Sequence, residues 1–380
     1  MSRMLMGRAL RGAKASSVWE QQACIIQQQR SFSQTPSRQS PKVIFDKTTS
    51  PGLGPILEEI QNNIILPYHL PIHQRKRVFS EKLQHRLKSD PVYLEIDGLE
   101  HRFSHINKLA LPPSRSLTWK AMRAMKTHQD WNNFPRLLSG MRNAGRRYSQ
   151  FDYIKMIDIA GDKGQIYSII DAARQTRKTG LRLDDSEKVN TVLYHVQMRA
   201  VESGWDKEIT QQALRWTEMV IAMLEDPNHA FSHKKRKNWF KVPGRARDPQ
   251  ILAAALHLSA VLAVKHNDGK DIDGKVKKYA TNITKLWPAS QGLLKLNRKY
   301  ANEKDRSDFA YLAESRAKYL SCASTILHGL FMASRVVEKP LAEQLRAISK
   351  SLASEVRIAV EWQTTYAGRG LRTYNTLFQK

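Results

Sequence analysis

The chain has 380 residues, 41% hydrophobic and 26% charged, so it can fold two or three domains of about 100–200 residues and is not a wholly disordered chain. Its 62 Lys and Arg outnumber its 35 Asp and Glu, for a formal charge of +27. This surplus indicates a polyanionic partner. The two cysteines, Cys24 and Cys322, exclude a disulfide framework and a cysteine-based zinc site.

Residues 1–32 have the composition of a mitochondrial transit peptide. Five basic residues (Arg3, Arg8, Arg11, Lys14 and Arg30) stand against Glu20, and no apolar run is long enough for a secretory signal. The segment Arg30–Ser33 resembles a matrix cleavage site, with cleavage after Phe32. We expect location in the mitochondrial matrix, with an ordinary basic tail as the alternative reading.

Removal of this segment would lower the charge of +27 by only four, to +23, so the transit peptide does not explain the basicity. The longest nearly apolar run, Ile251–Val264, is shorter than the roughly 20 residues that cross a bilayer. No transmembrane span is therefore expected. A peripheral contact with the anionic inner membrane, made by positive charge alone, stays open.

The N-terminal third predicts little regular structure. Residues 33–79 are rich in proline and polar residues, which indicates an extended or disordered arm with one short regular stretch near Ile56–Ile65. Residues 80–116 predict a short helix up to Lys88, followed by a β-hairpin. Its strands, Val92–Ile96 and His101–Ile106, flank an Asp97-Gly98 turn.

Residues 117–230 carry apolar side chains at helical spacing. A shift of 35 residues superposes Met122 on Ile157 and Gly145 on Gly180, and a basic segment precedes each of these glycines. A period of this length predicts stacked helical hairpins. A generic helical bundle with one coincidental spacing is the alternative.

These units resemble the pentatricopeptide repeat family, whose two-helix units of about 35 residues close on a Met-x-x-x-Gly-like segment. Met141–Gly145 matches that segment, Phe151–Asp185 matches the unit length, and a looser third unit begins at Ser186. Asn190 is a weak counterpart of the family's asparagine, and the Pro-Asp that often ends a unit is absent. The resemblance covers about 110 residues and implies a scaffold, without a base-by-base code.

Residues 248–380 predict a C-terminal helical domain. Asp248 and Pro249 favour a helix start before Gln250–Lys265. Further helices are expected over Val276–Trp287, Phe309–Val337 and Leu341–Tyr366. The predicted fold class is therefore all-α, an α-solenoid of stacked helical hairpins with one small β-hairpin near the N-terminus.

Catalytic signals are weak. The His-x-x-x-His spacing occurs at His69/His73, His101/His105 and His229/His233, each without the Glu of a metalloprotease motif. Gly161–Gly164 lacks the length of a P-loop and is better read as a turn between helices. We therefore expect no enzyme, no metal and no cofactor.

The strongest functional pattern is a basic loop at residues 231–247. It contains no acid, and its candidate RNA-binding residues are Lys234, Lys235, Arg236, Lys237, Trp239, Phe240, Lys241, Arg245 and Arg247. The cations suit phosphates and the aromatic pair suits unpaired bases. A solvated basic loop anchored by its aromatics is the alternative. Smaller basic patches lie at residues 74–77, at Arg142 with Arg146 and Arg147, and at Lys275 with Lys277 and Lys278.

Taken together, these patterns predict a non-enzymatic mitochondrial RNA-binding protein of organellar gene expression. It would be a mitochondrial ribosome component or a factor for translation or RNA maturation, with ribosomal or messenger RNA and ribosomal proteins as partners. The alternative is a protein-binding scaffold or assembly factor for a respiratory-chain complex at the inner membrane.

Overall fold

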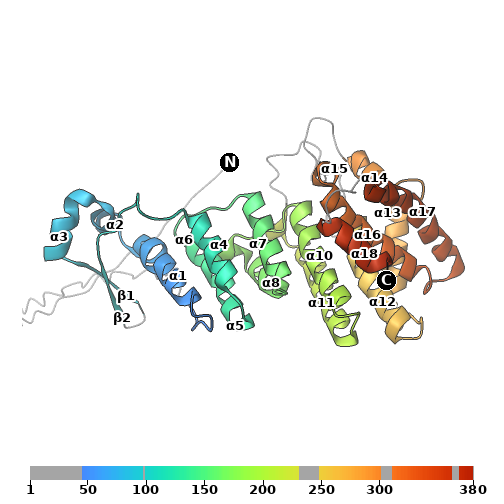
Figure 1. Ribbon diagram of the computed structural model, residues 1–380, viewed down its shortest axis with the longest axis horizontal. Helices are drawn as coiled ribbons and strands as arrows, with labels where there is room; N and C mark the ends of the chain where they lie inside the picture. The colour runs from blue at the N-terminus through green and yellow to red at the C-terminus, as the bar shows by residue number, and fades with distance from the viewer. Residues whose placement is uncertain (1–44, 97–98, 231–247, 301–309, 362–367, 380) are drawn as a thin grey trace, which may run out of the picture. The chain divides into compact units, whose positions relative to one another are not determined.

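The computed structural model describes residues 45–96, 99–230, 248–300, 310–361 and 368–379. These residues are mostly helical and include a two-stranded antiparallel sheet, as labelled in Figure 1. The predicted fold class is confirmed.

The short regular stretch expected near Ile56–Ile65 is present, beginning at Leu53, but helical structure continues to Phe79, where an extended arm was expected. This segment contains α1 (Leu53–Ile60), a π-helical turn (Gln61–Ile65), a 3-10 turn (Leu66–His69) and α2 (Ile72–Phe79). The prolines lie in first turns or just before a helix, where a missing N–H costs little. Leu53, Leu57, Ile60 and Ile64 are buried in the core, and this burial stabilises the segment.

The residues just before α1 are fixed by a buried carboxylate, that of Asp130 in α5 (His128–Trp131). It accepts hydrogen bonds from the Thr49 N–H (2.8 Å) and the Ser50 hydroxyl (2.6 Å). Burial alone would raise the pKa of Asp130, but these bonds and those from the Lys126 and Thr127 N–H groups outweigh it and hold the pKa well below its usual range.

The β-hairpin follows a 3-10 turn (Glu81–Leu83) and α3 (Gln84–Ser89), which replace the single short helix predicted there. Its strands are β1 (Val92–Ile96) and β2 (Leu99–Phe103), with Val92 opposite Phe103 and Ile96 opposite Leu99. The second strand begins and ends earlier than predicted. It ends at Phe103 because the chain then turns to α2, where the Ile106 N–H donates to the Val78 carbonyl (3.0 Å).

This N-terminal part has a small core of its own. Its buried side chains are Leu66, Leu70, Val78, Leu87, Val92, Phe103 and Ile106. An isolated hairpin is only marginally stable. Here Val92 and Phe103 pack with side chains of α2 and α3, so the sheet is stabilised by burial rather than by strand pairing alone.

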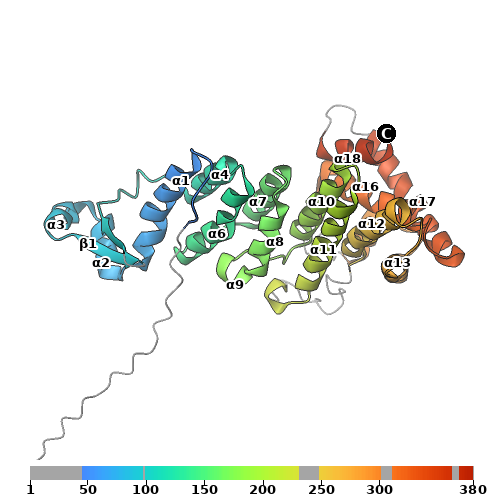
Figure 2. The same ribbon diagram turned by 90° about the horizontal axis from the view of Figure 1, so that it is seen from below.

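The central part is a stack of helical hairpins in two layers. Its helices are α4 (Ser114–Ala124), α6 (Asn133–Asn143), α7 (Gln150–Asp162), α8 (Ile166–Arg174), α9 (Thr176–Thr179), α10 (Ser186–Glu202) and α11 (Lys207–Met223). The first helices of the successive hairpins form one layer, in which α1 packs on α4, α4 on α7 and α7 on α10. The second helices form the other layer, in which α6 packs on α8 and α8 on α11 (Figures 1 and 2). Each hairpin therefore buries its faces against the next one.

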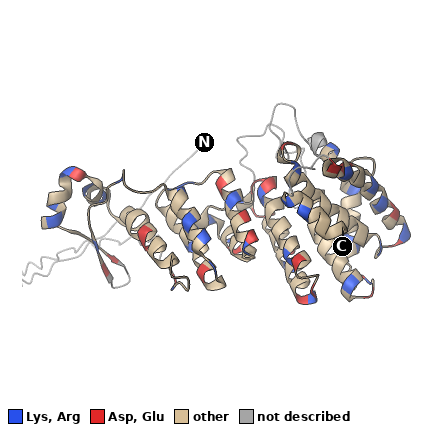
Figure 3. Cartoon of the chain, viewed as in Figure 1, with Lys and Arg blue, Asp and Glu red and all other residues tan. Residues whose placement is uncertain are grey.

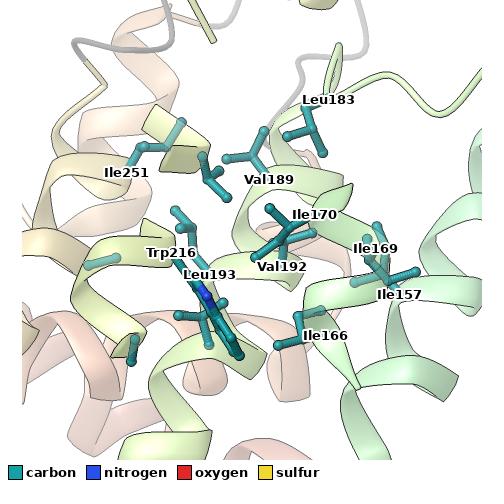
Figure 4. Packing of buried hydrophobic residues seen from close by; sticks show 14 of the residues in the cluster. Ile157, Ile166, Ile169, Ile170, Leu183, Val189, Val192, Leu193, Trp216 and Ile251 are labelled. Carbon is teal, nitrogen blue, oxygen red and sulfur yellow. The ribbon is translucent and has the colours of Figure 1, made fainter. Parts of the chain in front are cut away.

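Figure 4 shows one of these junctions. Ile166 and Ile170 of α8 lie beside Val192 and Leu193 of α10, with Trp216 of α11 in the same cluster. The Tyr167 and Trp216 rings also lie 5.3 Å apart. The core is continuous across hairpins, because neither hairpin alone could enclose these side chains.

The 35-residue period coincides with two equivalent backbone turns. Gly145 and Gly180 have φ of +71° and +79°, a left-handed conformation that favours glycine. Gly145 follows α6 and Gly180 follows α9, so both close a hairpin. The turn predicted over Gly161–Gly164 is shorter, because Gly161 and Asp162 still belong to α7 and only Lys163 and Gly164 form it. Lys163 donates to the Arg123 and Met125 carbonyls of the preceding hairpin (2.6 and 2.9 Å).

The C-terminal part contains more helices than the sequence pattern predicted. They are α12 (Pro249–His266), α13 (Lys275–Leu286), α14 (Leu293–Tyr300), α15 (Ala310–Glu314), α16 (Arg316–Ala333), α17 (Lys339–Glu361) and α18 (Arg369–Phe378). The helix expected over Phe309–Val337 is broken at Ser315, which caps α16. The helices α14 and α18 were not predicted. No described helix is long and apolar enough to span a membrane.

Helices α12 and α16 cross closely at Gly329, and α18 packs on α16. Nearby, Cys322 packs against the core, where burial, with a contribution from Asp248, raises the pKa of its thiol to about 12.

Two buried histidines link three helices. His257 Nδ1 lies 2.8 Å from the Gln197 side-chain oxygen, and His257 Nε2 lies 2.8 Å from His328 Nδ1. An amide oxygen only accepts, so Nδ1 of His257 donates to it and the neutral Nε2 accepts from His328. Burial lowers the pKa of both residues, that of His328 to about 4 with help from Lys265 and Arg335.

We predict that this pair makes stability fall with acid. Below pH 6.5 the unfolded chain takes up protons that the folded chain excludes, so the free energy of unfolding should drop by about 1.4 kcal/mol per pH unit for each histidine. The drop begins near pH 6.5 and continues toward pH 4. Urea unfolding between pH 7.5 and 4.5 measures it. His328→Gln should lower that slope by about 1.4 kcal/mol per unit; an unchanged slope would contradict the assignment.

We predict that Gly329→Ala destabilises the chain although alanine is the better helix former. An added Cβ would lie 2.8 Å from the His257 Cβ and 2.9 Å from its Cα, so backbone must shift. The expected loss is about 1–3 kcal/mol, read from chemical denaturation. Gly54→Ala is the matched control, because its Cβ would meet only the Thr48 hydroxyl at 3.4 Å. Equal stability of the two variants would refute close packing at the crossing.

Candidate nucleic-acid interface

The predicted basic loop lies outside the described residues, but both of its ends are fixed. Before it, the buried His229 ring accepts a hydrogen bond from the Leu183 N–H at Nδ1 (3.0 Å). After it, Asp248 caps α12 through the Gln250 N–H (2.9 Å). The described chain is therefore anchored on both sides of this segment, at His229 and at Asp248. The RNA contacts predicted in this segment stay predictions, namely those of Lys234, Lys235, Arg236, Lys237, Trp239, Phe240, Lys241, Arg245 and Arg247.

The basic patch at residues 275–278 is largely neutralised. Lys275 pairs with Glu218 and Lys277 pairs with Glu338, each at 2.8 Å. Figure 3 shows acidic and basic residues interspersed on α10 and α11 as well. This patch is therefore a poor candidate for binding phosphates, in contrast to the sequence-based reading.

The other two basic patches converge on one hollow of about 860 Å³. Arg75 and Lys76 of α2 line it together with Arg146, which follows α6. Lys108, between β2 and α4, adds a fourth cation. The full lining comprises Ile64, Tyr68, Ile72, Arg75, Lys76, Phe79, Ser80, Leu83, Lys108, Leu111, Pro112, Pro113, Ser114 and Arg146.

The remaining arginines of these two patches face other partners. Arg77 forms an ion pair with Asp90 (2.7 Å). Arg142 donates to the Thr176 carbonyl (2.6 Å) and packs over Gly180, so it joins two hairpins. Arg147 is exposed but does not line the hollow. The fold thus separates cations with a structural role from those that face the hollow.

Three of the four cations of the hollow lie over aromatic rings. Arg75 lies 4.8 Å and Arg146 5.8 Å from the centre of the Tyr68 ring, and Lys108 lies 4.7 Å from that of Phe79. Tyr68 is 36% exposed and Ile72 is 64% exposed. None of the described lining residues is an Asp or Glu. The hollow combines positive charge with apolar surface, as nucleic-acid sites do.

Sequence reasoning missed Tyr68, Phe79 and Lys108. Arg75 and Arg146 are about 70 positions apart, and no local spacing links them. The only signal available in the sequence was the cluster of basic residues at 74–77 beside aromatic residues, which is common on solvated surfaces.

The histidine pairs fall in places that do not suggest a metal site. His69 ends a 3-10 turn and His73 lies in α2, while His101 is on β2 and His105 follows it. His233 lies outside the described residues. Across the described ranges, no three His, Cys, Asp or Glu side chains are grouped so as to hold an ion.

Fold and surface together define a class of protein: a stack of helical hairpins that gathers cations and aromatic rings at one hollow. Residues 30–376 match the family described as mitochondrial ribosomal protein mS27 (Mrp13). The chain is 33% identical over 354 residues to small ribosomal subunit protein mS27 of Neurospora crassa, and the match covers 88% of each chain. The chain belongs to the mitochondrial ribosomal protein mS27 family.

Membership of this family confirms three predictions: a mitochondrial ribosome component, a place in organellar gene expression and location in the matrix. The match covers nearly the whole chain, including the central hairpins.

Proposed function

We propose that this chain is a non-enzymatic component of the small subunit of the mitochondrial ribosome and that it contacts ribosomal RNA. The observation that carries the proposal is the match to the small-subunit protein mS27 over 88% of both chains. The charge of +27 supports it, because a protein that neutralises RNA phosphates gains affinity from counterion release.

The basic loop at residues 231–247 is the proposed principal contact. Its seven cations would face phosphates, and Trp239 and Phe240 would stack on unpaired bases, an interaction worth about 1–3 kcal/mol per base. The residues that flank it support this role, since His229 and Asp248 are both anchored in the fold.

We further propose that the central hairpins are pentatricopeptide-like units that serve as a scaffold rather than as a base code. The equivalent left-handed turns at Gly145 and Gly180 support a repeat. Asn190, the weak counterpart of the family's asparagine, donates instead to the Tyr311 hydroxyl (2.6 Å). Its amide therefore serves packing between helices.

The loop can be tested by neutralising Lys234, Lys235, Arg236 and Lys237 to Gln in the full chain. The affinity for mitochondrial small-subunit RNA should then depend less steeply on salt. The slope of log affinity against log salt concentration should fall by about 3, because four cations are removed and each phosphate contact on a single strand contributes about 0.7. Fluorescence anisotropy from 50 to 200 mM salt measures this slope.

The matched control neutralises the same number of exposed cations away from the loop, namely Lys339, Arg346, Lys350 and Arg357. It should leave the slope nearly unchanged. Sedimentation of mitochondrial lysate tests the assignment itself, and the chain should travel with the small subunit. Sedimentation with a membrane complex instead would favour the assembly-factor alternative.

A further inference from the structure

We propose that the hollow between α2 and the end of α6 binds a short unpaired stretch of RNA, with its phosphates on Arg75, Lys76 and Arg146. This inference rests on the proposed function, because it assumes that ribosomal RNA is within reach. It adds a second RNA contact, far in sequence from the basic loop and built by the fold.

Charge is the first argument. Four cations line the hollow, and its described lining contains no carboxylate. Elsewhere in the described chain, basic residues are often paired, as Lys275 is with Glu218 and Lys277 with Glu338. Cations that converge on one concave surface without acids repel each other, and an anion in the hollow would relieve that cost.

The rings provide the second argument, because they hold the guanidinium groups in place. Arg75 and Arg146 both lie over Tyr68, at 4.8 and 5.8 Å from the ring centre. A guanidinium fixed in this way loses less side-chain entropy when it binds a phosphate. The planar groups can also stack on bases, as arginine does in RNA complexes.

Size and surface indicate a single strand rather than a duplex. The hollow of about 860 Å³ can receive a ligand of one or two nucleotides but not the width of an A-form helix. Ile72 is 64% exposed at its edge, and Leu111 and Pro112 line it, so bases would meet apolar surface while phosphates meet cations. A duplex would present only its backbone.

The chain's own basic segments do not suit the hollow. Residues 1–32 hold five basic residues and one acid, and the loop at 231–247 holds seven cations and no acid. Both would be repelled by Arg75, Lys76 and Arg146. These two segments are therefore poor occupants, whereas an anion suits the hollow.

The test uses the full-length chain and a fluorescein-labelled, mixed-sequence single-stranded RNA of ten nucleotides. Neutralising Arg75, Lys76 and Arg146 to Gln should lower the salt slope by about 2 and weaken binding about tenfold at 100 mM salt. Tyr68→Leu keeps every cation, so it should weaken binding about two- to fivefold and leave the slope unchanged. Neutralising Lys339, Arg346 and Arg357 is the matched control and should have no effect.

A second measurement needs no variant. Ultraviolet crosslinking of the intact mitochondrial small subunit, followed by peptide mapping, should find RNA attached to the peptide that contains Tyr68 or Phe79. Two further probes identify the ligand class, an RNA duplex of the same length and a poly-glutamate peptide. Each should bind the variant with Arg75, Lys76 and Arg146 neutralised as tightly as it binds the unaltered chain. Preferential loss of poly-glutamate binding would instead assign the hollow to an acidic protein segment.

The outcomes separate this inference from the proposed function. If the chain travels with the small subunit and the loop variant loses RNA affinity, while the hollow variant and the crosslinks show no RNA there, the inference is overturned and the function stands. If the chain does not travel with the small subunit, the proposed function fails whatever the hollow binds in isolation.

Discussion

The structure depends on burial between hairpins rather than within them. A helical hairpin of about 35 residues is too thin to enclose its own apolar faces, so α7 packs on α4 and α10, and α8 packs on α6 and α11. This repeated contact produces one core that runs from Leu53 to Val356. Each hairpin is therefore stabilised by its neighbours.

The same stacking determines which charges remain on the surface for a partner. Arg142 and Lys163 are basic, yet each donates to carbonyl groups of an adjacent hairpin and so serves the scaffold. Lys275 and Lys277 are paired with carboxylates from other helices. Arg75, Lys76 and Arg146 instead meet across a hollow lined with aromatic and apolar side chains. Net charge alone thus overstates the number of basic patches that suit RNA.

Much of the fold could be predicted from local sequence patterns. The helix at Pro249–His266 begins one residue from its predicted start, because an Asp cap and a first-turn proline are local signals. The sequence indicated only the short regular stretch near Ile56–Ile65 of the helical segment 53–79, since its prolines, judged without context, resemble helix breakers. In the fold these prolines lie in the first turn of a helix or just before it. The residues before α1 are fixed by the Asp130 carboxylate, which binds Thr49 and Ser50 from about 80 positions away.

The sequence by itself determined the compartment, the all-α class and the surplus of cations, because composition and helical period are properties of short stretches of chain. It also singled out residues 231–247 as a candidate RNA contact by their density of basic residues. Only the tertiary structure decided that Arg75 and Arg146 lie over the same tyrosine ring, that Lys277 is paired, and that His257 and His328 share a buried hydrogen bond. The physical reason is that packing of distant hairpins, which no local pattern encodes, sets the surroundings of each side chain.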